Sequence, residues 1–462
     1  MDMNVTKNRC LEVAEFVVGL KFQDIPPEVI GKEKDHLLDG LGNGLYGSAS
    51  PFGTMVKNYL KRLPSTPEAV LWGTSQRVSC AEAAFANGSF SNYAELEDAH
   101  HRTKFKPNTC LTPAAIAVAE LTGANGQDVL TALIAANEIC LRIATATHVG
   151  KEGYARGWIG TSSMGALGAA AITGRLLGFS VEQMAHALAL AGAQPCGIWS
   201  GGMAMAKRVL IGKAAENGIK AAFMAAEGTT GGFDIFDGEW GNLGHIISPV
   251  YEPEVITKEL GGYWWTMEIG LECYPTKGGV HSAIDCVLDI LKQEPKLDPD
   301  QIEDTLVRAT TGIAGNKALR VFPPKDFYEA QNSMGYILAV TLFDKACGNE
   351  QFTEAKIRDE KILRLGQKIR VMPDAEADRL APKTKTTFVD IRMKDGRVLT
   401  SRVDYCKGEP ENPLTREELE LKFKKVAQAV LDEDGMAKVI KTVGQLETLS
   451  NFKDLTKLLA AK

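Results

Sequence analysis

Apolar residues recur every three to four positions through roughly the first 265 residues, which is the spacing of amphipathic helices. One such stretch covers residues 128–150 and another covers residues 203–228, and each ends at a glycine, a common helix terminator. Residues 162–194 are so rich in glycine and alanine that we expect closely packed helices buried on all sides. Strands and helices do not alternate along this part of the sequence, which argues against a doubly wound sheet.

The pattern changes after residue 268. Residues 305–315 and 385–405 carry alternating β-branched residues that indicate strands, and Asp395 and Gly396 give the signal of a hairpin turn. Residues 280–294 between them return to helical spacing. We therefore predict a mainly α protein with an α+β second domain: a large helical domain at 1–268, a smaller, lid-like α+β domain at 269–408, and C-terminal helices at 409–462 that return to the helical domain.

Composition narrows the possible classes of protein. Hydrophobic residues make up 45% of the chain and charged residues 24%, as in an ordinary globular protein. The net charge of −6 and the lack of a basic block argue against nucleic acid as a partner. The first residues lack the layout of a signal peptide, and no apolar run reaches the roughly 18 residues of a membrane helix. The nine cysteines form no C-x-x-C pair, which favours reduced thiols. We expect a cytoplasmic protein without a membrane partner.

The segment YAELEDAHHRTKFKPNT, residues 93–109, concentrates acidic, basic and histidine side chains in an otherwise alanine-rich chain. A metal site there is a weak hypothesis, because His100 and His101 are adjacent and adjacent helical residues point about 100° apart. The seven histidines include no H-x-H or H-E-x-x-H spacing. A solvated charged turn is the simpler interpretation, and we predict no metal.

Other motifs give only weak evidence for a binding or catalytic site. GNGLYG at residues 42–47 matches a dinucleotide-binding fingerprint, but the preceding residues 28–41 predict a helix instead of the required strand. We interpret this motif as a close-packed helix end. No G-x-S-x-G motif of a serine hydrolase is present. Lys207 lies in a nearly apolar segment, where a lysine usually extends to solvent, although a buried lysine can take part in chemistry.

Six segments, in the right order, resemble the MmgE/PrpD family, which includes 2-methylcitrate dehydratase, cis-aconitate decarboxylase and iminodisuccinate epimerase. They are LLDGLGNGLYGS, LWGTSQRVSCAEAAFANGSFSNYAELEDAH, RGWIGTSSMGALGAAAITGRLLGFS, MAKRVLIGKAAENG, CYPTKGGVHSAID and AQNSMGYILAVTLFD. The resemblance spans nearly the whole chain. It implies a large helical domain with a smaller α+β domain, a homodimer, and no cofactor.

The resemblance also implies an active site. Its catalytic residues would be Asp98, Lys207, His281 and Tyr336, and its substrate-binding positions Lys106, Lys277, His100 and Ile159. The chain departs from the family at three of these positions. Ile159 stands where a histidine is expected, Lys106 begins a Lys-Pro step in place of a His-Pro or His-Ser step, and Lys277 replaces a cysteine.

The family reactions move a proton at a carbon next to a carboxylate, which requires a base of near-neutral pKa and fixed cations. His281 is the expected base, Lys207 the group that holds a substrate carboxylate, Tyr336 a proton donor, and Asp98 an orienting or second acid–base group. We predict a cofactor-independent lyase, a dehydratase or decarboxylase, for a small di- or tricarboxylate. Two alternatives stay open: an epimerase or isomerase of a dicarboxylate, and a non-catalytic small-acid-binding or scaffold protein, which the replaced histidines would favour.

Overall fold

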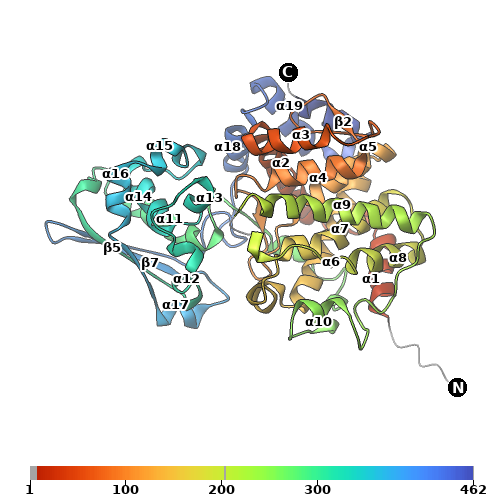
Figure 1. The fold of residues 1–462 in the computed structure, drawn as a ribbon, viewed down its shortest axis with the longest axis horizontal. Coiled ribbons are helices and arrows are strands. Elements are labelled where there is room, and N and C mark those ends of the chain that lie inside the picture. The colour runs from red at the N-terminus through yellow and green to blue at the C-terminus, as the bar shows by residue number, and fades with distance from the viewer. Residues whose placement is uncertain (1–7, 202–203, 461–462) are drawn as a thin grey trace. The chain divides into compact units, whose positions relative to one another are not determined.

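The computed structural model describes residues 8–201 and 204–460, and the chain divides into two compact units. Unit 1 comprises Met1–Tyr93, Glu97–Gly270 and Thr415–Lys462, and unit 2 comprises Ala94–Leu96 and Leu271–Leu414. Unit 1 is helical and unit 2 combines helices with a mixed sheet (Figure 1). The predicted fold class, a large helical domain with a smaller α+β domain, is confirmed.

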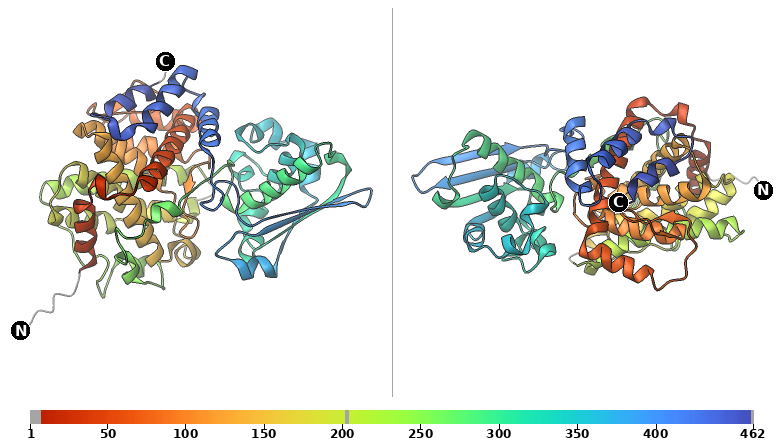
Figure 2. Two further views of the ribbon diagram at one scale, coloured as in Figure 1. Left: turned by 180° about the vertical axis from the view of Figure 1, so that it is seen from behind. Right: turned by 90° about the horizontal axis from the view of Figure 1, so that it is seen from above.

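Unit 1 is built from helices in closely packed layers. Its helices are α1 (Arg9–Gly19), α2 (Pro27–Ala49), α3 (Pro51–Leu60), α4 (Cys80–Ser91), α5 (Leu111–Thr122), α6 (Gly126–Ala146), α7 (Gly160–Leu176), α8 (Val181–Gly192), α9 (Ala206–Ala226), α10 (Leu243–Ile247), α18 (Arg416–Ala427), α19 (Glu433–Gly444) and α20 (Lys453–Thr456). Helices α4, α6, α7 and α9 pack side by side (Figure 1). The C-terminal helices α18 and α19 pack against α2 near the start of the chain (Figure 2).

The strands of unit 1 are only two residues long and lie in the segments between helices. Strands β1 (Ala69–Val70) and β2 (Arg77–Val78) form an antiparallel pair, and β3 (Asp98–Ala99) lies inside the charged segment 93–109. Helix α9 begins at Ala206, so the part of the predicted helix 203–228 at residue 203 lies outside the described residues.

Glycines let the last turns of α2 touch their neighbours. A Cβ at Gly44 would lie 2.3 Å from the Trp72 ring, and one at Gly47 would lie 2.0 Å from the carbonyl oxygen of Phe90. These approaches are shorter than any real carbon contact, so only glycine fits. The motif at residues 42–47 is therefore a close-packed helix end, as predicted, and the dinucleotide fingerprint lacks its strand.

Helix α6 is the core helix of unit 1. By length and apolar composition it is long enough to cross a membrane, but 94% of its most apolar window is buried inside the structure. Burial of this kind is the normal state of a core helix.

Unit 2 contains a four-stranded sheet in the order β6–β5–β7–β8. Strand β5 (Ile302–Ala309) pairs in parallel with β6 (Ile369–Pro373) and antiparallel with β7 (Thr387–Met393), which pairs with β8 (Val398–Val403). Strand β4 (Gly270–Leu271) lies at the boundary between the two units along the chain. The predicted turn between β7 and β8 is confirmed, with Gly396 at a φ of +89°. Strand β6 was not anticipated, and residues 311–314 form a helix where the sequence suggested strand.

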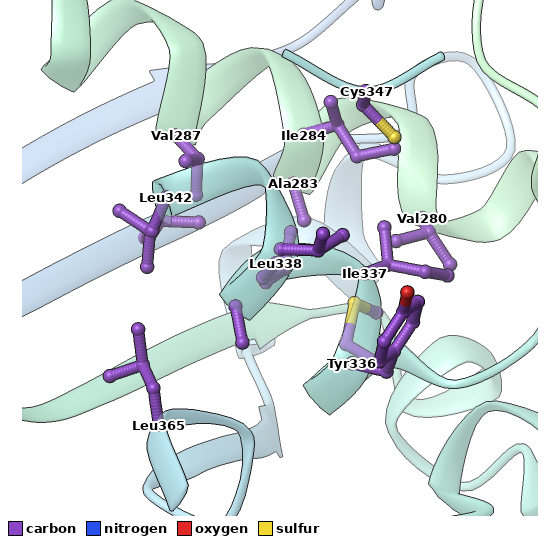
Figure 3. Close-up of a cluster of buried hydrophobic side chains, with 14 of the residues drawn as sticks. Val280, Ala283, Ile284, Val287, Tyr336, Ile337, Leu338, Leu342, Cys347 and Leu365 are labelled. Atoms are coloured by element: carbon purple, nitrogen blue, oxygen red, sulfur yellow. The ribbon is translucent and has the colours of Figure 1, made fainter. Parts of the chain in front are cut away.

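Unit 2 also contains short helices. They are α11 (His281–Gln293), α12 (Thr311–Ala314), α13 (Phe327–Ala330), α14 (Met334–Asp344), α15 (Glu354–Ile357), α16 (Glu360–Gly366) and α17 (Ala375–Leu380). Helices α11 and α14 pack on the strands, and α16 packs on α14. The core between them joins Ile284 and Val287 of α11 to Ile337 and Leu338 of α14 (Figure 3).

We expect Gly47→Ala to lower the free energy of unfolding by about 2–3 kcal/mol, because the added methyl group overlaps main-chain atoms that cannot move aside. Gly31→Ala is the matched control in the same helix, since a Cβ there meets nothing within 4 Å. This control should raise stability by roughly 0.5–1 kcal/mol through helix propensity. Urea-unfolding midpoints compare the two variants with the wild type. Equal midpoints for the two variants would contradict the close-packing argument.

Candidate active site

The predicted site residues are distributed over both units, and each unit is described by itself. Unit 1 contains Asp98, His100, Lys106, Ile159 and Lys207, and unit 2 contains Lys277, His281 and Tyr336.

Asp98 is a fully buried carboxyl group in β3. Both of its oxygens accept the main-chain N–H of Asn108, at 3.1 and 3.2 Å, in the short 3₁₀ helix that begins at Pro107. Burial raises the pKa of Asp98 well above its usual range, and the negative charges of Asp39 and Glu97 act in the same direction, against the Asn108 hydrogen bond and the charge of Lys106. A protonated Asp98, able to donate a proton, is therefore favoured.

Lys106 lies close to Asp98 and to the start of α7. Its ammonium group is 3.3 Å from Glu97 Oε1, and its main-chain N–H donates to Thr161 Oγ1 at 3.0 Å. Ile159 directly precedes α7, is 6% exposed, and donates its N–H to the carbonyl of Gly197 at 2.9 Å. An isoleucine side chain cannot transfer protons, so the position where a family histidine was expected carries no acid–base chemistry here.

The start of α9 packs near the start of α7. Cys196 Sγ lies 3.3 Å from the carbonyl oxygen of Ser162 and 4.0 Å from that of Leu210, so the loop before α9 links the first turns of both helices. Lys207 is half-buried in the first turn of α9. The first N–H groups of α7 have no intrahelical acceptor and carry partial positive charge. Unit 1 thus collects Asp98, Lys106 and the starts of α7 and α9 in one region.

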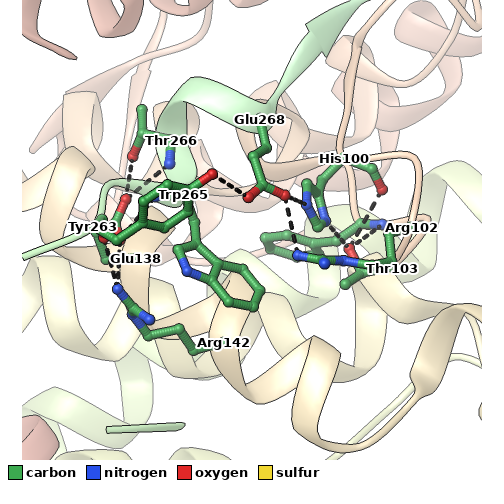
Figure 4. A network of polar contacts seen from close by, with 10 residues as sticks. His100, Arg102, Thr103, Glu138, Arg142, Tyr263, Trp265, Thr266 and Glu268 are labelled. Carbon is green, nitrogen blue, oxygen red and sulfur yellow. Dashed lines mark hydrogen bonds and ion pairs between the residues drawn. The ribbon is translucent and has the colours of Figure 1, made fainter. Parts of the chain in front are cut away.

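His100 is held by protein groups at both ring nitrogens (Figure 4). Its Nδ1 is 2.8 Å from Thr103 Oγ1, and its Nε2 is 3.1 Å from Glu268 Oε2. Glu268 also accepts hydrogen bonds from Arg102 at 3.0 Å and from the Tyr263 hydroxyl at 2.8 Å. Burial lowers the pKa of His100, which favours the neutral ring. These contacts give His100 a positioning function in the turn after Asp98, and its role in substrate binding stays a prediction.

A second part of the same network fixes the segment before Glu268. The buried Arg142 guanidinium donates to the carbonyls of Lys258 at 2.8 Å and Tyr263 at 2.7 Å. Glu138, one turn earlier in α6, accepts the main-chain N–H of Thr266 at 2.8 Å. The Trp265 ring lies between the guanidinium groups of Arg142 and Arg102 (Figure 4). Sequence analysis missed this network. The available signal was a Glu–Arg pair, four residues apart, within an otherwise apolar helix.

In unit 2, His281 opens α11 and is 1% exposed. Its Nε2 lies 3.3 Å from the carbonyl oxygen of Thr276. A carbonyl only accepts, so Nε2 carries the hydrogen and the lone pair of the neutral ring is at Nδ1. The ring also packs edge-on against Tyr274 at 5.3 Å, and the Tyr274 hydroxyl donates to Asp285. His281 is thus held between the Thr276 carbonyl and the Tyr274 ring.

Lys277 and Tyr336 have different surroundings. Lys277 is half-buried, and its main-chain N–H donates to the carbonyl of Gln331 at 3.0 Å. Tyr336 is fully buried in the core of unit 2, close to Ile337 and Val280 (Figure 3). Its hydroxyl donates to the main-chain carbonyl of Gln351, and burial raises its pKa. These contacts explain Tyr336 as a packing residue, and its role as a proton donor stays a prediction.

Within residues 8–201 and 204–460, no three histidine, cysteine or carboxylate side chains are grouped in a way that would hold a metal ion. All nine cysteines are free thiols, and most are buried.

The chain matches two family models, the MmgE/PrpD N-terminal domain over residues 11–253 and the MmgE/PrpD C-terminal domain over residues 274–447. It is 27% identical over 474 residues to a cis-aconitate decarboxylase-like protein of Aspergillus oryzae, covering 98% of each chain. It is 27% identical over 481 residues to the cis-aconitate decarboxylase of Aspergillus terreus, covering 99% of this chain and 97% of the relative. The human cis-aconitate decarboxylase is 28% identical over 462 residues, covering 96% of this chain and 93% of the relative. Because the two models together match most of the sequence, the chain belongs to the MmgE/PrpD family.

Proposed function

We propose that this protein is a lyase that removes carbon dioxide or water from a small di- or tricarboxylate, with cis-aconitate as the first candidate substrate. The observation that carries the proposal is the region of unit 1 where the fully buried Asp98 lies close to Lys106 and the start of α7. The relatives support it, because they resemble this chain from end to end and are named as cis-aconitate decarboxylases.

Positive groups in this region suit a substrate with several carboxylates. Lys106 and Lys207 supply full charges, and the first turn of α7 supplies N–H donors and the positive end of a helix dipole. Fixed donors of this kind stabilise negative charge as it develops during reaction. In unit 2 we assign Lys277 a similar role and His281 that of a base.

The chemistry requires an acid as well as cations. Decarboxylation breaks a carbon–carbon bond, leaves its electron pair on the carbon skeleton, and ends when a proton forms the new C–H bond. Burial favours the protonated form of Asp98, so we assign Asp98 as this acid. The reaction needs no redox step, and we propose that it proceeds without a cofactor, in a cytoplasmic homodimer.

A dicarboxylate epimerase is the second candidate. Such an enzyme removes a proton and returns it on the other face of the carbon, which requires two acid–base groups. The family resemblance offers Asp98 of unit 1 as an acid and His281 of unit 2 as a base. Product analysis separates the candidates, because an epimerase keeps the composition of its substrate, whereas a decarboxylase releases carbon dioxide and a dehydratase releases water.

We expect Lys207→Ala to lower kcat/KM by about 100-fold or more, the usual effect of removing a group that stabilises developing charge. Proton NMR in D₂O would follow deuterium uptake and product formation with cis-aconitate, 2-methylcitrate and aspartate-derived diacids. Lys220→Ala is the control on the same helix, because Lys220 is exposed and pairs with Glu216, and it should keep full turnover. If Lys207→Ala and His281→Ala both keep full turnover, the assigned roles are wrong.

We expect the wild-type kcat to fall as the pH rises through the raised pKa of Asp98, because the acid form is lost there. Asp98→Asn should be about 100-fold slower or worse and should lack this descending limb. Rate–pH profiles under saturating substrate measure both effects. Asp128→Asn, which changes an exposed carboxylate of the same unit, should preserve the wild-type profile. A descending limb that persists in Asp98→Asn would show that another group supplies the proton.

A further inference from the structure

Two buried ion pairs lie near Asp98 in unit 1. Glu97, the residue before Asp98, is 1% exposed, and its Oε1 lies 3.3 Å from the Lys106 ammonium group. Asp39 of α2 is 3% exposed and forms an ion pair with Lys422 of α18. Both lysine side chains are mostly buried. Each of these two carboxylates therefore has a counter-charge, which a buried charge requires.

Both members of the Glu97–Lys106 pair are held in place by further hydrogen bonds. The side-chain amide of Asn92 donates to Glu97 Oε1, the same oxygen that lies next to the Lys106 ammonium group. Asn92 follows directly after α4 and is fully buried. Lys106 donates its main-chain N–H to Thr161 Oγ1 in the first turn of α7. The pair is thus fixed next to the end of α4 and the start of α7.

Asp98 is close to both members of this pair. Glu97 is its neighbour in the chain, and Asn108, whose N–H donates to Asp98, is two residues beyond Lys106. Burial has the largest effect on the pKa of Asp98 and raises it. Of the two charges, Lys106 lowers this pKa and Glu97 raises it. The balance between the two charges therefore affects how readily Asp98 ionises.

A lysine close to a buried carboxyl group normally favours its ionised form. A positive charge within about 4–6 Å lowers the pKa of a carboxyl group by about 1–3 units, because it stabilises the anion. The effect increases in an interior of low dielectric. If Glu97 were neutral, the Lys106 charge would be balanced less and would stabilise the Asp98 carboxylate. An ionised Asp98 has no proton to donate.

We propose that Glu97 is a positioning residue for Asp98: it binds the Lys106 ammonium group and so prevents that charge from ionising Asp98. The part that Asp98 takes in the reaction rests on the proposed function, whereas the interaction among the three side chains does not. Glu97 itself transfers no proton in this scheme. Its contribution is the negative charge that balances Lys106, together with the hydrogen bond to Asn92 that fixes where the ammonium group lies.

Other titratable groups also act on Asp98 from the helices around it. They are Lys32, Glu33 and Asp39 of α2 and Cys110 at the start of α5. These groups stay the same when Glu97 or Lys106 is replaced. A change in the titration of Asp98 that has opposite signs in the two replacements is therefore due to the pair itself.

The test is a titration of Asp98 in the full chain without substrate. The infrared absorption of its carboxyl group, identified by its loss in Asp98→Asn, gives the apparent pKa in each variant. We expect Glu97→Gln to lower this pKa by about 1–3 units and Lys106→Met to raise it. The double variant E97Q/K106M should return toward the wild-type value, because both charges are removed together.

Glu120→Gln is the matched control. Glu120 is 2% exposed in the same unit and lies 3.2 Å from the Arg77 guanidinium, so the same substitution again removes a buried, paired carboxylate. It should leave the Asp98 titration unchanged. If Glu97→Gln does not fold, the double variant is compared with Lys106→Met, and the pKa of Asp98 must be lower in the double variant.

Rate–pH profiles with cis-aconitate give the kinetic counterpart. The pH at which kcat falls should be lower in Glu97→Gln than in the wild type and should move back in the double variant, which a merely structural role would not produce. An Asp98 titration that is unchanged in Glu97→Gln, or that moves in the same direction in Glu97→Gln and Lys106→Met, would overturn this inference even if cis-aconitate is turned over. Opposite shifts without turnover of any acid tested would refute the proposed function alone.

Discussion

Burial of carboxyl groups among helices is the constraint on which the rest of unit 1 depends. Removing an ionised carboxylate from water is costly unless a charge, several hydrogen bonds or a proton compensates it. The compensating group differs from one buried carboxyl group to the next. Glu138 accepts main-chain N–H groups and lies 3.5 Å from the Arg142 guanidinium, whereas Asp39 pairs with Lys422. Asp98 and Glu33 accept hydrogen bonds from neutral groups, and burial raises the pKa of both carboxyl groups.

Close packing of the helices increases the effect of burial on these carboxyl groups. The glycines of α2 and the alanine- and glycine-rich α7 bring helices near enough to exclude water from the region around Asp98. In such a low-dielectric interior, hydrogen bonds and like-charge repulsion both act more strongly than in solution. The network around Glu268 and Arg142 fixes the turn that follows Asp98, so the acid is held on a rigid support. The small residues of the sequence predicted the close packing, but nothing in the sequence predicted the buried charged groups. In the structure, both features surround Asp98.

The sequence was informative where a signal was local. Periodicity located helix α6, the Asp-Gly pair located the hairpin turn at Gly396, and the motif at residues 42–47 located the close-packed glycines. Strand β6 was missed because it is an edge strand with mostly exposed residues, so its side chains do not alternate. Glu33 and Glu138 were missed because their partners are far away in sequence: Glu33 meets Asn137 104 residues later. Tyr336, which its motif indicated as a proton donor, lies in the buried core of unit 2, and its catalytic role stays a prediction.

The replacement of a family histidine by Ile159 gains meaning in this setting. A histidine shuttles protons because its pKa lies near neutrality, and an isoleucine at the entrance to α7 removes that option while keeping the volume filled. In the proposed function, proton transfer in unit 1 falls to a carboxyl group, whose pKa must be raised by burial before it can act as an acid near neutral pH. Lys106 adds a charge next to Glu97 in the same region and limits how far the negative potential builds up. In the proposed lyase, the fully buried Asp98 is the carboxyl group that would supply the proton in place of the missing histidine.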